Sequence, residues 1–236
     1  MDRSLNVGEI ISRTFSIYVD QASVLLPAAA VVFVLTGILT AVLVVIAPLL
    51  AIAAFIIALV ATTLFTGMVV ELVADVQDGR RDATVGQLLE AARPVIGKLI
   101  LVGIVAGIGI LIGFVLIVVP GLILITIWAV AAPVIVLERP PGLGALSRSR
   151  ELVRGNGWQV FGVLVVLVIG VEILAVILES IGDSAGAGAG IVVRVIVQIL
   201  TAPLAALAAS VLYFELREPT PVTPIEAAPA APTGTL

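Results

Sequence analysis

The amino-acid sequence predicts an all-α polytopic membrane protein with six transmembrane helices arranged as three hairpins. Of its residues, 61% are hydrophobic and only 12% are charged, a composition that excludes an ordinary soluble domain. Its apolar residues also gather in long segments close to the roughly 20 residues that a helix needs to cross about 30 Å of hydrocarbon. These predicted spans are Val24–Ile46, Leu49–Val73, Val95–Val118, Gly121–Leu137, Val160–Leu178 and Ile191–Leu212.

Basic residues lie almost entirely on one side of these spans. Eleven of the twelve Lys and Arg residues fall in or beside the N-terminal segment, the second and fourth connections, or the C-terminal segment. Only Arg194 falls on the opposite side. Short connections rich in Lys and Arg stay in the cytoplasm, so both termini are expected there. The first span is too long for a signal-peptide core, which predicts an uncleaved helix.

A short amphipathic segment precedes each predicted hairpin, near residues 7–18, 85–92 and 145–153. In the first two, a capping residue (Asn6 or Thr84) is followed three positions later by Glu or Gln, the pattern that begins a helix. The third segment lacks this cap. Apolar residues recur at helical spacing with polar residues opposite, which indicates helices lying in the membrane interface rather than polar loops with accidental periodicity.

Proline and glycine mark the predicted turns between the paired spans. Ala47-Pro48 and Pro120-Gly121 are expected to form the first two hairpin turns. Residues 182–190, rich in Gly and Ala, are expected to form a flexible loop in the third.

The six-helix domain is expected to cover residues 1–216 and to be followed by a disordered tail, 217–236. This tail is rich in Pro, Ala and Thr and cannot bury enough apolar surface to fold. Its prolines Pro219, Pro221 and Pro224 could alternatively offer an extended ligand to a partner domain.

Cysteine and histidine are both absent, which excludes a large part of catalytic chemistry. Without them the chain has no disulfide, no thiolate nucleophile, no histidine base, and no zinc or haem site built from these residues. No clustered carboxylates and no phosphate-binding glycine motif are visible either. We therefore expect a protein without catalysis and without a cofactor, and no nucleic-acid binding, because the basic residues are dispersed.

Glu172 is the acid that stands out, because it lies well inside the fifth predicted span. A charge at a helix centre costs about 2.5–3.5 kcal/mol on insertion scales, so such an acid suggests a function and a partner. If the fifth and sixth helices are antiparallel neighbours, Gln198 lies at similar depth and Arg194 about one turn farther out. We interpret Glu172, Arg194 and Gln198 as a candidate intramembrane polar network that locks the hairpin. The alternative is proton or solute handling.

Small, basic and proline residues supply weaker signals. Gly103, Gly107, Gly109 and Gly113 form two small-xxx-small pairs, which favour helix packing inside the bundle over dimerisation. The prolines Pro133 and Pro203 are expected to kink or interrupt their helices. The candidate headgroup contacts are Arg148, Arg150 and Arg154, on the third amphipathic segment.

Several short motifs are shared with a known group of membrane proteins. They are Gly8-Glu9-Ile10-Ile11, Arg13-Thr14-Phe15, Pro120-Gly121, Pro133, Val136-Leu137-Glu138, Ala145-Leu146-Ser147-Arg148-Ser149, Leu152-Val153-Arg154-Gly155 and Trp158. In this pattern the chain resembles a poorly characterised bacterial multi-helix family related to the membrane domain of glycerophosphodiester phosphodiesterases. The resemblance implies a membrane domain in a bacterial inner membrane. It does not imply phosphodiesterase activity, because the catalytic barrel of those enzymes is separate and needs histidines.

The sequence therefore favours a non-catalytic membrane protein with a structural, lipid-binding or accessory role in the cell envelope. Membrane lipids are the expected partners, together with a protein partner or further copies of the chain. The competing hypothesis is a small transporter or channel that uses Glu172.

Overall fold

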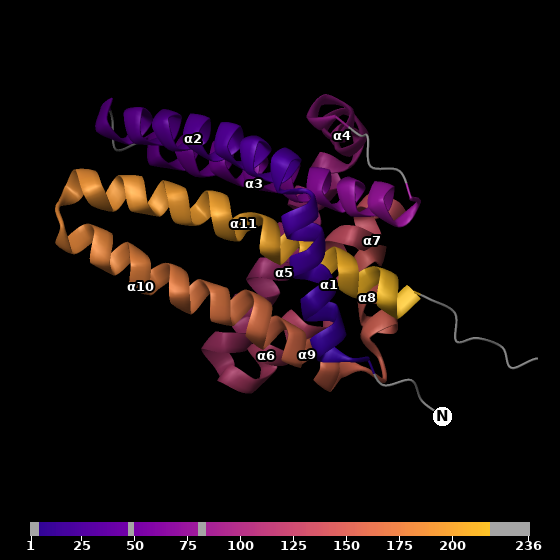
Figure 1. Cartoon of the computed structure of the whole chain (residues 1–236). Coiled ribbons are helices and arrows are strands. Elements are labelled where there is room, and N and C mark those ends of the chain that lie inside the picture. The colour runs from indigo at the N-terminus through magenta and orange to yellow at the C-terminus, as the bar shows by residue number, and fades with distance from the viewer. Residues whose placement is uncertain (1–4, 47–49, 80–83, 218–236) are drawn as a thin grey trace, which may run out of the picture.

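The computed structural model describes residues 5–46, 50–79 and 84–217, and these residues are almost entirely helical (Figure 1). Within them, six helical stretches are long and apolar enough to cross a membrane, so the expected all-α membrane fold is confirmed. The expected turn at Ala47-Pro48 and tail residues 218–236 lie outside the described ranges. The elements are α1 (Val7–Asp20), α2 (Ala22–Ile46), α3 (Ala51–Gln77), α4 (Val85–Ala92), η2 (Arg93–Val95), α5 (Ile96–Leu116), α6 (Val118–Ile127), α7 (Ala131–Leu137), α8 (Gly144–Val153), α9 (Gly157–Leu164), the π-helical η3 (Val165–Ile169), α10 (Gly170–Ser184) and α11 (Ala187–Arg217).

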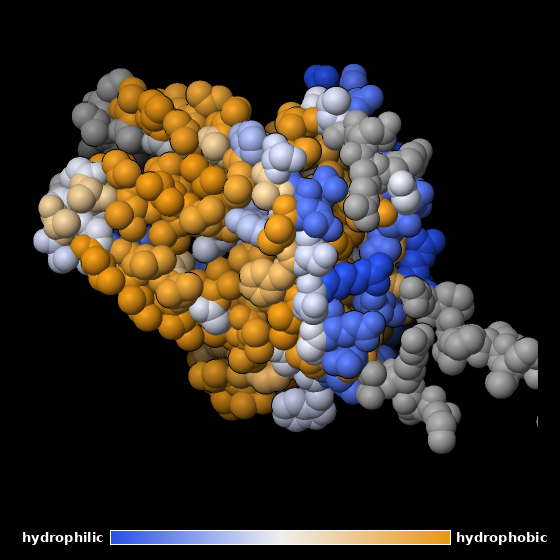
Figure 2. All heavy atoms as spheres, viewed as in Figure 1, coloured by the Kyte–Doolittle hydropathy of each residue, from blue (hydrophilic) through white to orange (hydrophobic). Residues whose placement is uncertain are grey.

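The surface divides into a broad apolar belt and one hydrophilic end (Figure 2). Along the long helices, large apolar side chains are left exposed, among them Leu35, Leu111 and Ile191 at 62–63%. Such a belt fits lipid tails rather than water. Hydrophilic residues gather where α1, α4 and α8 lie, and we call this region the polar end.

The short helices α1, α4 and α8 occupy the three segments that the periodicity predicts. Each precedes one pair of spans: α2 and α3, then α5 with α6 and α7, then α9–η3–α10 with α11. Of the three, α1 buries Ile10, Thr14 and Ile17 against the bundle and leaves its other side exposed. Figure 1 shows α1 crossing the long helices rather than extending one of them.

Local hydrogen bonds explain where two of these helices begin. The side chain of Asn6 accepts hydrogen bonds from the backbone N–H groups of Gly8 and Glu9 at 3.1 and 3.3 Å. Thr84 and Gln87 form the reciprocal capping box at the start of α4. No side-chain cap begins α8, as its sequence indicates.

The turn of the second hairpin is not at Pro120-Gly121, and this expectation is wrong. Helix α5 ends at Leu116, Ile117 alone is extended with φ −163°, and α6 begins at Val118. Pro120 therefore lies in the first turn of α6, where a missing backbone N–H costs nothing. Gly121 serves close packing instead, because a Cβ placed there would lie 2.6 Å from Cγ of Phe114.

The fourth span is interrupted between α6 and α7, at Trp128–Val130. Pro133 lies in the first turn of α7 and has no N–H for a continuous helix, which explains the break. The N–H of Ala131 bonds to the Trp128 carbonyl, which leaves the Ile127 carbonyl without its helical partner. The hydroxyl of buried Ser149 on α8 donates to that carbonyl at 2.9 Å. By contrast, α11 continues through Pro203.

The third hairpin has a tight turn and not the flexible loop expected at residues 182–190. Only Ala185 and Gly186 separate α10 from α11, and Gly186 has φ +115°, which glycine adopts without strain. The flanking glycines let the two helices approach. A Cβ on Gly182 would lie 2.7 Å from the Cβ of Val193.

Candidate functional site

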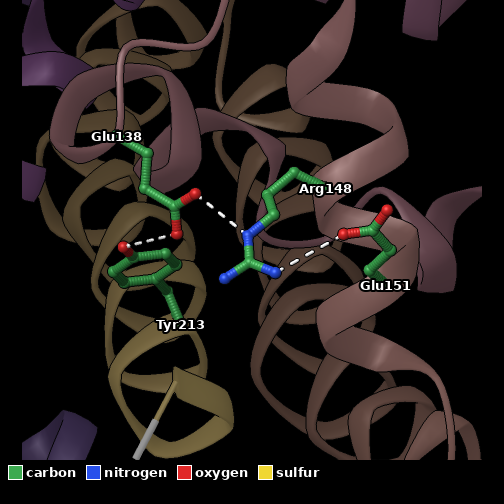
Figure 3. A network of polar contacts seen from close by, with 4 residues as sticks. All are labelled: Glu138, Arg148, Glu151 and Tyr213. Atoms are coloured by element: carbon green, nitrogen blue, oxygen red, sulfur yellow. Dashed lines mark hydrogen bonds and ion pairs between the residues drawn. The ribbon is translucent and has the colours of Figure 1, made fainter.

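A network of polar contacts joins three helices at the polar end (Figure 3). Glu138, directly after α7, accepts a hydrogen bond from Nε of Arg148 on α8 at 3.0 Å. Its other carboxylate oxygen accepts from the hydroxyl of Tyr213 on α11, also at 3.0 Å. Glu151 contacts Arg148 at 3.4 Å from an exposed position. Because each oxygen of Glu138 accepts a hydrogen bond from a different helix, this network fastens α7, α8 and α11 together.

The electrostatics of the network are fixed by Glu138. Its hydrogen bond raises the pKa of Arg148 above the ordinary arginine value, so Arg148 stays charged. The Tyr213 side chain is fully buried, and its hydroxyl has Glu138 as its acceptor. Of the four members, the sequence analysis named only Arg148 as a candidate site residue, and it missed Glu138, Glu151 and Tyr213.

A second ion pair fastens α1 to the bundle. One guanidinium nitrogen of Arg13 donates to Glu215 on α11, and another donates to Oε1 of Gln77 on α3 at 2.7 Å. A cavity of about 230 Å³ lies beside this pair and is lined by Arg13, Ser16, Ile17, Asp20, Gln21, Val76 and Gln77. At this cavity, Glu215 and Gln77 thus each accept a hydrogen bond from the guanidinium group of Arg13.

The three candidate headgroup residues differ in the structure. Arg148 forms ion pairs with Glu138 and Glu151, and its side chain is 39% exposed. Arg150 and Arg154 are exposed, and no acid pairs with them in the described part of the chain. Trp158, at the start of the fifth span, is 84% exposed. Exposed tryptophan and arginine side chains that lie close together in the sequence are typical of a membrane interface.

Arg194 does not join Glu172 in the structure. Its guanidinium lies 3.4 Å from Glu179 and 3.1 Å from Asp183, both on α10 nearer the turn. The reason is the tight turn, which makes Asp183 part of the helix opposite Arg194 instead of part of a loop. Arg194, near the turn between α10 and α11, thus has two acids as neighbours.

Glu172 and Gln198 are both exposed on the α10–α11 hairpin. Among the described residues, no hydrogen bond or ion pair joins Glu172 to Gln198 or Arg194. The expected network of these three residues is therefore replaced by an ion-pair cluster of Glu179, Asp183 and Arg194.

The four glycines of α5 divide into two pairs. A Cβ on Gly109 would lie 2.9 Å from the Trp128 ring, and one on Gly113 would lie 2.9 Å from the backbone nitrogen of Gly121. This pair packs inside the bundle, as expected. Gly103 and Gly107 are exposed, with nothing within 4 Å of an added Cβ, so they do not pack within the chain.

Comparison with protein families, with curated proteins and with solved structures found no match for this chain. The resemblance inferred from the sequence motifs thus stays a prediction. In the described residues, no group of three Asp, Glu, His or Cys side chains is placed to hold a metal ion.

Proposed function

We propose that this chain is a non-catalytic integral membrane protein of a bacterial inner membrane that contacts anionic lipid with its polar end. The polar end then faces the cytoplasm, because it carries most of the basic residues. The polar network of Glu138 and the ion pair of Arg13 support a structural role, since they hold short helices against the spans.

The observation that carries this proposal is the exposure of Arg150, Arg154 and Trp158, which lie close together in the sequence just before and at the start of the fifth span. Each basic residue near an anionic surface contributes about 1 kcal/mol. Together the two arginines could favour an anionic headgroup over a zwitterionic one by roughly thirtyfold at low salt.

Fluorescence of Trp158 tests the proposal directly. With Trp128 replaced by phenylalanine, Trp158 is the remaining tryptophan of the chain's two. In vesicles of mixed composition, brominated phosphatidylglycerol should quench it more strongly than brominated phosphatidylcholine. The Arg150→Gln/Arg154→Gln variant should lose this preference by several-fold, and added salt should weaken it in the parent chain.

Glu151→Gln is the matched control, because it alters the charge of the same helix with the opposite sign. It should keep or slightly raise the preference. Equal quenching of the parent chain by both lipids would refute the lipid contact.

A small transporter built on Glu172 is the less supported function. Such a protein needs the acid inside the bundle or facing a cavity, whereas the Glu172 side chain is exposed on the hairpin surface.

A further inference from the structure

We infer that one side of the α10–α11 hairpin is the contact surface between two copies of this chain in the membrane. The surface is defined by Glu172, Val176 and Glu179 on α10 and by Arg194 and Gln198 on α11. It is a different region from the lipid contact proposed for the polar end.

Helical spacing places these side chains on the same side. Arg194 reaches Glu179 and Asp183, so these three residues share one side of the hairpin. Glu172 lies seven residues before Glu179, two turns along the same stripe of α10. Gln198 lies four residues after Arg194, one turn along the same stripe of α11. The polar stripe thus runs from the hairpin turn into the apolar segment.

Glu172 and Gln198 also lie at similar depth along the hairpin. Glu172 lies thirteen residues before Ala185, and Gln198 lies twelve after Gly186. At 1.5 Å per residue both lie about 18–20 Å from the turn, at nearly equal depth in the hydrocarbon. Both are exposed, although lipid disfavours unpaired polar groups at that depth.

The symmetry of a homodimer makes a second copy of the chain a suitable partner for this surface. A two-fold axis along the membrane normal keeps every residue at its own depth, so side chains of equal depth meet across it. Glu172 of one copy then faces Gln198 of the other, and the contact occurs twice. The Gln198 amide donates to the Glu172 carboxyl group, which satisfies both side chains away from lipid. Neighbouring elements leave room, since α10 packs mainly against α11 and lies at the edge of the bundle (Figure 1).

Cysteine cross-linking tests the surface, because the chain contains no cysteine of its own. Val176 and Leu174 are a matched pair on α10, with exposed fractions of 60% and 57%. Val176 lies on the proposed surface, and Leu174 lies on nearly the opposite side of the helix. In membranes, Val176→Cys should form a covalent dimer with a bismaleimide long enough to reach across the axis from one α10 to the other. Leu174→Cys should stay monomeric.

Side-chain variants in the Val176→Cys background test the hydrogen bond itself. Gln198→Leu removes two symmetric contacts per dimer and should weaken dimerisation by roughly eightfold. Glu172→Gln keeps a hydrogen-bonding group and should retain the cross-link. Equal cross-linking at positions 174 and 176, none at 176, or a dimer joined through exposed Gly103 and Gly107 would each overturn the inference.

Discussion

Glu138→Ala is expected to lower the free energy of unfolding by about 2–3 kcal/mol. The variant leaves the buried Tyr213 hydroxyl without its acceptor, and losing a hydrogen bond to a charged group costs about 1.5–3 kcal/mol. The ion pair with Arg148 adds less, because that side chain is 39% exposed and screened by solvent. Thermal unfolding in detergent, followed by circular dichroism, measures the difference.

Glu151→Ala is the control for this prediction, because Glu151 contacts the same arginine from a side chain that is 67% exposed. It should change stability by no more than about 0.5 kcal/mol. A double-mutant cycle of Glu138→Ala with Tyr213→Phe should show a coupling of about 1 kcal/mol or more. Equal effects of Glu138→Ala and Glu151→Ala would contradict the role of the network.

Gly121→Ala should destabilise the second hairpin by about 1–3 kcal/mol, as over-packing in a close-packed interior does. The added Cβ would lie 2.6 Å from Cγ of the Phe114 ring, and the three atoms nearest to it all belong to that ring. Phe114→Ala in the same chain should recover part of the loss, because it vacates the space that the Cβ needs.

Gly107→Ala serves as the matched control within the same hairpin, since nothing lies within 4 Å of its added Cβ. Alanine also has the higher helix propensity, so this variant should be neutral or slightly stabilising. If Gly121→Ala changed stability as little as Gly107→Ala, a close contact between α5 and α6 would be excluded.

Hydropathy and helical spacing were sufficient to predict the spans and the three short helices, because lipid and amphipathic packing impose them on local sequence. The turns depended on tertiary contacts and were predicted less well. Pro120 and Gly121 read as a turn, yet one fits the first turn of a helix and the other a close approach to Phe114. The glycines near residue 186 similarly predicted a flexible loop, but in the structure they allow α10 and α11 to pack closely.

The polar sites were harder to predict because their members lie far apart in the sequence. Glu138 and Tyr213 are separated by 75 residues, and the spacing of neither suggests the other. Arg194 was assigned the wrong partner because Asp183 was expected in a loop. Its true partners follow once the turn is limited to Ala185 and Gly186.

Accessibility of single cysteines in intact cells tests most directly that the chain spans the membrane with its polar end inside. Ser147 on α8 and Ala185 at the hairpin turn are both exposed and lie at opposite ends of the molecule. A membrane-impermeant maleimide should label Ala185→Cys in intact cells, and Ser147→Cys only after the membrane is permeabilised. Labelling of Ser147→Cys from outside, with Ala185→Cys protected, would contradict the orientation, and labelling of both would contradict the membrane-spanning fold.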